Sequence, residues 1–120
     1  MYTAQDAEEW LRENNIQFFR TGSRVVCDPP VMDTDADIVA YDPVGKLNMR
    51  SWTEATTDDE YDGAVRTFRK GEVNLIVAGE ADDFKRWQIA THIAKSLNLT
   101  DKTQRIALFQ GVLYDNWSMF

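Results

Sequence analysis

The stretch Gly22-Ser23-Arg24, followed by Thr34-Asp35-Ala36-Asp37-Ile38-Val39, joins a tight turn to two carboxylates at the start of an apolar run. On an extended strand, residues i and i+2 point to the same face, about 7 Å apart along the chain. Two carboxylates in that arrangement can converge on a hard divalent cation, and the backbone N–H groups of the turn can hold a phosphate. The stretch therefore predicts a site for a nucleoside triphosphate and Mg²⁺.

Around this stretch, the apolar runs predict four strands. The third and fourth are expected to form a hairpin, with Arg69-Lys70-Gly71-Glu72 as its turn. Pro29-Pro30 ends the segment after the Gly-Ser turn, because proline supplies no N–H and restricts the residue before it. The expected strands cover residues 16–20, 37–41, 65–68 and 73–77.

Helical periodicity predicts one helix before the strands and two after them. The first is expected over residues 4–14, capped by Thr3. The others run from Asp82 or Asp83 to about Leu97, and onward from a Thr100 cap. We therefore expect an α+β fold in one domain, residues 1–120. Its small mixed sheet of about four strands would be covered by helices on one face.

Composition limits the classes of function. The 120 residues carry a net charge of −7, which disfavours non-specific DNA binding because phosphate neutralisation needs clustered Lys and Arg. Cys27 is the only cysteine, so an intramolecular disulfide is excluded and a reducing compartment is compatible. No apolar run approaches the roughly 20 residues of a membrane span, and the N-terminus lacks the basic region of a signal peptide. We expect no membrane association and a cytoplasmic location.

The spacing of Gly22-Ser23 and Asp35-Ala36-Asp37 resembles the hallmark of the DNA polymerase β-like nucleotidyltransferase superfamily, and most closely its minimal members. The later part of the chain is similar to short nucleotidyltransferase-like proteins of bacteriophages, which would place it in the host cytoplasm. The resemblance implies that Gly22 and Ser23 contact the β- and γ-phosphates, and that Asp35 and Asp37 bind Mg²⁺ or Mn²⁺.

A third carboxylate is expected from the resemblance on the neighbouring strand, where this chain has Asn74. Asparagine offers a carbonyl oxygen but neither a negative charge nor a base. Glu72 lies two residues earlier on the same side of the expected strand and is a candidate substitute. Arg24, beside the Gly-Ser turn, is a candidate phosphate ligand. Arg69 and Lys70 could also approach a triphosphate, but as turn residues they equally fit plain surface charge.

Each motif also has a structural interpretation when taken alone. Gly22-Ser23 fits a hairpin turn, and the acidic run fits a solvated loop. The acidic run also imitates the start of an EF-hand, but such a loop needs Gly and Glu where this chain has Ile38 and Val44. Only the combination of the two motifs favours the nucleotidyltransferase interpretation.

Two functions remain open from the sequence, and with them the question of whether the protein is an enzyme. One is metal-dependent transfer of a nucleoside monophosphate from an NTP to a hydroxyl on a protein, an RNA or a small molecule. Asp35, Asp37, Glu72 and Asn74 would form its catalytic site. The other is a catalytically inactive phage protein that inhibits a host enzyme or defence complex through its acidic surface.

Overall fold

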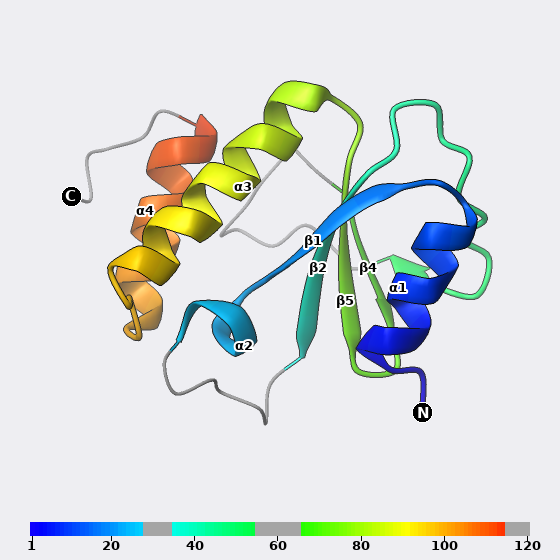
Figure 1. The fold of residues 1–120 in the computed structure, drawn as a ribbon, viewed down its shortest axis with the longest axis horizontal. Helices are drawn as coiled ribbons and strands as arrows, with labels where there is room; N and C mark the ends of the chain where they lie inside the picture. Colours follow the sequence, from blue (N-terminus) through cyan, green and yellow to red (C-terminus); the bar gives the residue numbers. More distant parts are fainter. Residues whose placement is uncertain (28–34, 55–65, 115–120) are drawn as a thin grey trace.

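A computed structural model describes residues 1–27, 35–54 and 66–114. Pro29-Pro30, Thr34 and Val65 lie outside the described residues. In chain order, the elements are α1 (Ala4–Glu13), β1 (Gln17–Thr21), α2 (Ser23–Val26), β2 (Ala36–Tyr41), β3 (Thr53–Glu54), β4 (Arg66–Lys70), β5 (Val73–Ala78), α3 (Ala81–Ser96) and α4 (Lys102–Tyr114) (Figure 1). The α+β class and the two C-terminal helices are confirmed.

The five strands form one mixed sheet in the order β1-β2-β5-β4-β3. β2 and β5 pair in parallel, and the other neighbouring strands pair antiparallel. The sequence predicted about four strands and missed β3, whose two residues are both exposed and carry no apolar alternation. β1 and β3 are therefore the outer strands of the sheet.

The β4–β5 hairpin has a shorter turn than the sequence predicted. Arg69 and Lys70 belong to β4, where they pair with Asn74 and Val73 of β5. Only Gly71 and Glu72 connect the strands. Gly71 has a φ of 58°, and a Cβ there would meet Tyr2 Cβ at 2.8 Å. The local polarity of Arg69 and Lys70 suggested a turn, but cross-strand pairing extends the strand over both residues.

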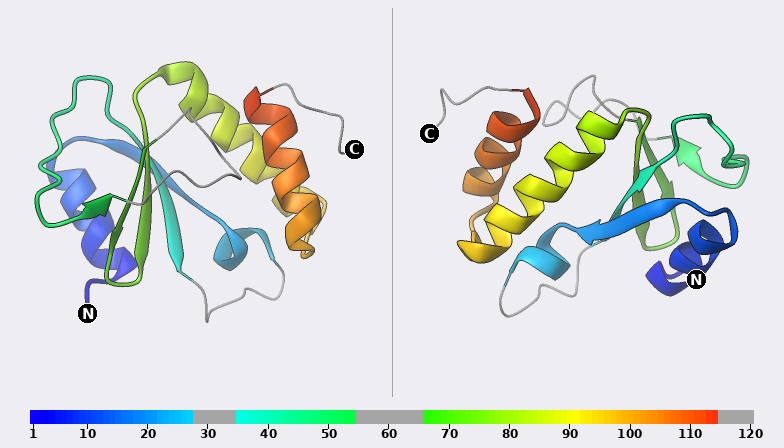
Figure 2. Two further views of the ribbon diagram at one scale, coloured as in Figure 1. Left: turned by 180° about the vertical axis from the view of Figure 1, so that it is seen from behind. Right: turned by 45° about the horizontal axis from the view of Figure 1, so that its top comes forward.

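Helices cover both faces of the sheet, which corrects the expectation of one covered face (Figure 2). On one face, α1 packs Ala7 and Leu11 onto the inward side chains of the strands. On the other, α3 and α4 pack onto Val39 and Ile76, with Val26 of α2 completing this second core. The candidate functional site lies on the face covered by α2, α3 and α4.

Local sequence explains the helix ends. The hydroxyl of Thr3 accepts from Asp6 N, and the Asp6 carboxylate accepts from Thr3 N, which makes the capping box that starts α1. At the start of α4, the carboxylate of Asp101 accepts from Gln104 N at 3.1 Å, so Asp101 caps this helix in place of the predicted Thr100. Within residues 1–27, 35–54 and 66–114, no helix is both long and apolar enough to cross a membrane.

Candidate functional site

Four polar side chains line up across the sheet, one from each of four neighbouring strands. Thr21 of β1 is paired with Asp37 of β2, Asp37 with Asn74 of β5, and Asn74 with Arg69 of β4. Side chains of directly paired residues lie on one face. The hydroxyls of Thr21 and Thr91 are 2.7 Å apart, and Thr91 belongs to α3, which places this set on the α3 face. We call Thr21, Asp37, Asn74 and Arg69 the polar row.

Asp37 is at the centre of the polar row. Asn74 Nδ2 donates a 3.0 Å hydrogen bond to Asp37 Oδ1. Burial raises the pKa of Asp37, and the negative charge of Asp35 raises it further, although the Asn74 hydrogen bond and two arginines act in the opposite direction. Asp37 is therefore a carboxylate whose negative charge is stabilised less well than in water. A bound cation would stabilise this negative charge.

Gly22 lies against the same carboxylate. It precedes α2 and has a φ of 81°, a conformation open mainly to glycine. A Cβ at this position would overlap Asp37 Oδ2 and would lie 2.9 Å from Asp37 Cγ. The sequence predicted a functional turn here, and the structure shows that glycine at this position leaves space for the Asp37 side chain. Ser23, the next residue, opens α2.

Asp35 precedes β2 and lies at the outer side of the site. Its Oδ2 is 2.7 Å from Nη1 of Arg69, in an ion pair whose side chains are 44% and 60% exposed, respectively. Asp35 and Asp37 are close enough for the charge of one to raise the pKa of the other. The structure therefore brings Asp35, Asp37 and Asn74 together, as the sequence predicted, and adds Arg69.

Glu72 and Arg24 form a separate pair beside the polar row. Arg24 Nη1 is 3.2 Å from Glu72 Oε2, and the same oxygen accepts a 3.2 Å hydrogen bond from Ala4 N at the start of α1. The Ala4 N–H, with Arg24, lowers the pKa of Glu72. From the sequence, Glu72 is a candidate substitute for the third acid. In the structure its carboxylate instead accepts a hydrogen bond from Ala4 N of α1 and pairs with Arg24.

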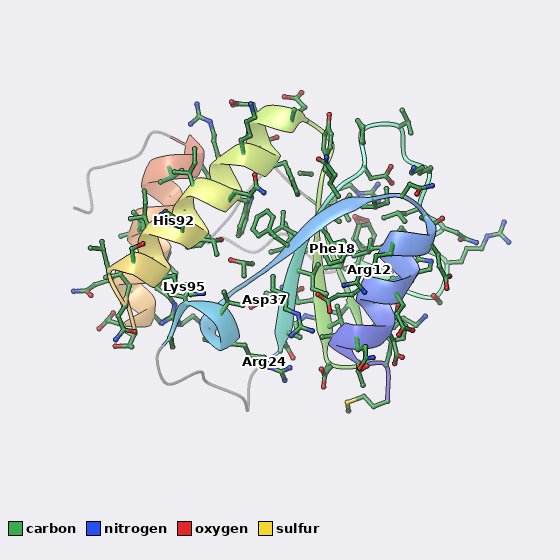
Figure 3. All side chains as sticks on the ribbon, viewed as in Figure 1. Arg12, Phe18, Arg24, Asp37, His92 and Lys95 are labelled. Carbon is green, nitrogen blue, oxygen red and sulfur yellow. The ribbon has the colours of Figure 1, made fainter. Side chains whose placement is uncertain are left out.

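Arg24 is oriented by Glu72 and is mostly buried, with 16% of its side chain exposed. Its Nε is buried and finds no hydrogen-bond partner among the described residues. Its charge still lowers the pKa of Asp37, and Figure 3 shows both residues at the same end of the sheet, beside α2. Arg24 thus lies near the predicted phosphate position but with a protein carboxylate already bound.

The donor chemistry of the site fits a hard divalent cation. Mg²⁺ and Mn²⁺ prefer carboxylate and carbonyl oxygens, which Asp35, Asp37 and the Asn74 amide supply. In the parts of the chain that the structure describes, no three His, Cys, Asp or Glu side chains cluster closely enough to hold a metal. A cation bound here would need the oxygen of the Asn74 amide, whose Nδ2 faces Asp37 in this structure, and would need Arg69 to leave Asp35.

The sequence alone does not assign Thr21 to the site, and it leaves Arg69 open between a contact with a triphosphate and plain surface charge. The sequence placed Arg69 in a turn, and its position opposite Asn74 follows only from the hairpin register. Thr21 pairs with Asp37, but nothing in the local sequence indicates its hydroxyl contact with α3. Both assignments depend on residues far apart in the chain.

Comparison with protein families, with curated proteins and with solved structures finds no match to this chain.

Proposed function

We propose that this chain is a metal-dependent nucleotidyltransferase-like protein, which transfers a nucleoside monophosphate from an NTP to a hydroxyl of a protein, an RNA or a small molecule. One observation carries the proposal. The Asp37 carboxylate is set between a glycine that leaves space for it and an amide that orients it. A half-buried carboxylate held in this way, with a second carboxylate nearby, is typical of a site for a cation and its phosphate ligand.

In this reaction the acceptor oxygen forms a bond to the α-phosphorus, the bond from that phosphorus to the bridging oxygen breaks, and pyrophosphate leaves. Bound Mg²⁺ or Mn²⁺ would stabilise the charge that develops on the phosphate oxygens. Asp35, Asp37 and Asn74 would hold the ion, and Gly22, Ser23 and Arg24 would position the phosphates. We expect the protein to act in the cytoplasm.

The proton of the acceptor hydroxyl needs a base. Asp37, the carboxylate of the polar row, would be bound to the cation, whose positive charge would lower its pKa and make it a weak base. Asn74 has no basic site, and the lowered pKa of Glu72 makes that group a weaker base than usual. Transfer by this site is therefore expected to be slow and to favour acceptors whose hydroxyl is already acidic.

A second candidate function follows from the lack of a strong base in the site. Because Asn74 replaces an acid and Glu72 is bound to Arg24, the site lacks a dedicated third carboxylate. This arrangement, with the net charge of −7, favours a catalytically inactive protein that inhibits a host enzyme or defence complex through its acidic surface. Such a protein would bind its partner whether or not Asp35 and Asp37 are intact.

The two candidates are separated by a labelling experiment. The full chain is incubated with α-³²P-labelled NTPs, Mg²⁺ or Mn²⁺, and a bacterial lysate, and covalent label is counted in the protein and RNA fractions. Under the enzyme proposal, label appears only with metal and is lost in the Asp35→Asn/Asp37→Asn variant, while circular dichroism shows that this variant is folded.

The matched control is Glu9→Gln/Glu13→Gln, which removes two negative charges from exposed positions of α1. It should label as well as the original chain. Label that survives the Asp35→Asn/Asp37→Asn change would contradict the proposed site. An absence of label together with lysate proteins retained equally by the original chain and that variant would support the inhibitor.

A further inference from the structure

Arg69 occupies the place that a cation would take on Asp35. Its Nη1 lies 2.7 Å from Asp35 Oδ2, and its positive charge also lowers the pKa of Asp37. The guanidinium thus pairs with one of the two carboxylates that the proposed function assigns to the metal and lies near the other. A divalent cation can bind both carboxylates only if this ion pair opens.

The ion pair is well suited to opening. Both side chains are about half exposed, at 60% for Arg69 and 44% for Asp35. Exposed ion pairs contribute little to stability, because water solvates both charges when they separate. Loss of this contact would therefore leave the fold intact.

The backbone keeps Arg69 at the site after the pair opens. Arg69 lies in β4 directly opposite Asn74, which in turn is opposite Asp37. The register of three strands fixes its Cα, so only the side chain can move. A guanidinium is a planar fork of N–H donors that matches phosphate oxygens as well as it matches carboxylates.

We infer that Arg69 exchanges counterions: it binds Asp35 in the ligand-free protein and binds the phosphate chain of an NTP when a divalent cation takes its place on Asp35. This inference rests on the proposed function and assigns a residue that the sequence had placed in a turn. The exchange makes binding of the metal and of the nucleotide mutually dependent, since each ligand supplies what the other displaces. Free metal has to compete with Arg69 for Asp35, whereas the metal–nucleotide complex brings an anion for Arg69.

The test uses the full chain and its Arg69→Ala variant in two binding measurements. The first titrates Mn²⁺ alone and follows free Mn²⁺ by electron paramagnetic resonance. The second follows the fluorescence anisotropy of a labelled, non-hydrolysable ATP analogue at saturating Mn²⁺. Neither measurement depends on turnover.

The two affinities should change in opposite directions. Without the competing positive charge, Arg69→Ala should bind Mn²⁺ alone roughly three- to tenfold more tightly. Without the phosphate ligand, it should bind the analogue about tenfold or more weakly. Arg69→Lys keeps the charge but not the fork, so its affinity for Mn²⁺ should stay near that of the original chain while its affinity for the analogue is only partly restored.

Arg66→Ala is the matched control. Arg66 lies on the same strand and pairs with Glu54 at 2.8 Å, with similar exposures of 70% and 48%. Its side chain lies three residues away, opposite Val77 and outside the polar row. The same change in net charge there should alter both affinities by less than about twofold, since exposed charges a Debye length apart are largely screened.

Each outcome decides between the proposals. Opposite changes in Arg69→Ala alone support the exchange. If the original chain binds Mn²⁺ and the analogue but Arg69→Ala leaves both affinities unchanged or weakens both, the exchange is wrong and the proposed function stands. If the original chain binds neither Mn²⁺ nor the analogue, the proposed function and the exchange both fail.

Discussion

Two neighbouring rows of side chains on the α3 face of the sheet have opposite chemistry. The polar row is Thr21, Asp37, Asn74 and Arg69. Two residues further along the same strands lies what we call the inner row: Phe19, Val39, Ile76 and Thr67, which are also paired directly with one another. The strands, pairing and face are the same for both rows. The two rows differ in solvent exposure, because helices bury the centre of the inner row and leave much of the polar row accessible.

The comparison shows how this small sheet combines a stable core with a row of polar side chains. Val39 and Ile76 pack under α3 and α4, and Phe19 stacks edge-on against Phe84 of α3 at a ring separation of 5.2 Å. Burial of these groups stabilises the register. The same register then sets the spacing of Asp37 and Asn74, which contribute little packing themselves. The inner row should therefore control stability, and the polar row should control ligand binding.

Truncation of the inner row should give the largest effect. Ile76→Ala removes a side chain that is only 4% exposed, so the free energy of unfolding should fall by about 2–5 kcal/mol. Urea denaturation followed by circular dichroism measures it. Asn74→Ala, two residues away on the same strand, is the control and should cost about 1 kcal/mol. Equal losses at the two positions would contradict the division between the rows.

A side chain at Gly22 should have the next largest effect. Gly22→Ala places a Cβ against Asp37 in a backbone conformation with positive φ, and we expect a loss of about 1–3 kcal/mol in the free energy of unfolding.

Gly45→Ala separates the two causes. Gly45 also has a positive φ, of 67°, but a Cβ there meets nothing within 4 Å. It should cost only about 1 kcal/mol, the conformational part alone. Denaturation midpoints of the two variants, compared under the same conditions, isolate the contact with Asp37. If Gly22→Ala costs no more than Gly45→Ala, then that contact does not constrain the site.

Asn74→Asp would make the polar row more acidic. The change replaces the donor to Asp37 with a second carboxylate, so the metal-free protein should lose about 1–2 kcal/mol. Millimolar Mg²⁺ should reverse the loss, because the ion would bind both carboxylates. Thermal melts with Mg²⁺ and with EDTA measure this. A melting temperature that falls equally in both buffers would argue against a metal at this position.

The smallest effect should be the pH dependence that Asp37 contributes. Burial raises its pKa in the folded protein, so the folded state binds this proton more tightly than the unfolded state does. Stability is therefore lost as the pH rises from about 4, the ordinary pKa of aspartate, through the raised pKa. Asp37→Asn removes the ionisation, so its stability relative to the original chain should increase between pH 4 and pH 7. Urea midpoints of both proteins in EDTA would measure the difference, and a difference that is constant with pH would contradict it.

Much of the fold could be predicted because its signals are local. The capping box at Thr3 and the apolar stripe of α3 depend on residues within a few positions of one another. The predicted strand over 37–41 differs from β2 by one residue. Two features were not local: β3 is too short to show a pattern, and the sides of the sheet on which the helices pack depend on the chain path.

In the candidate site, too, some features could be predicted from local sequence and others depend on distant contacts. Asp35, Asp37 and Gly22 stand out in the sequence, and their residue types suffice to suggest a cation and a phosphate. The ion pair of Arg69 with Asp35 joins residues 34 positions apart, and it exists only because a two-residue turn places Arg69 inside β4. The hydrogen bond from Ala4 N of α1 to Glu72 likewise depends on how the first helix packs. No local pattern records either contact.

The close approach of Gly22 and Asp37 also constrains how this sequence can diverge. A larger residue at position 22 is accommodated better after position 37 has become smaller, so the order of the two substitutions affects the stability of the intermediate. Even then the positive φ of Gly22 disfavours any side chain. Related sequences that have lost the carboxylate at position 37 are thus expected to retain glycine at position 22.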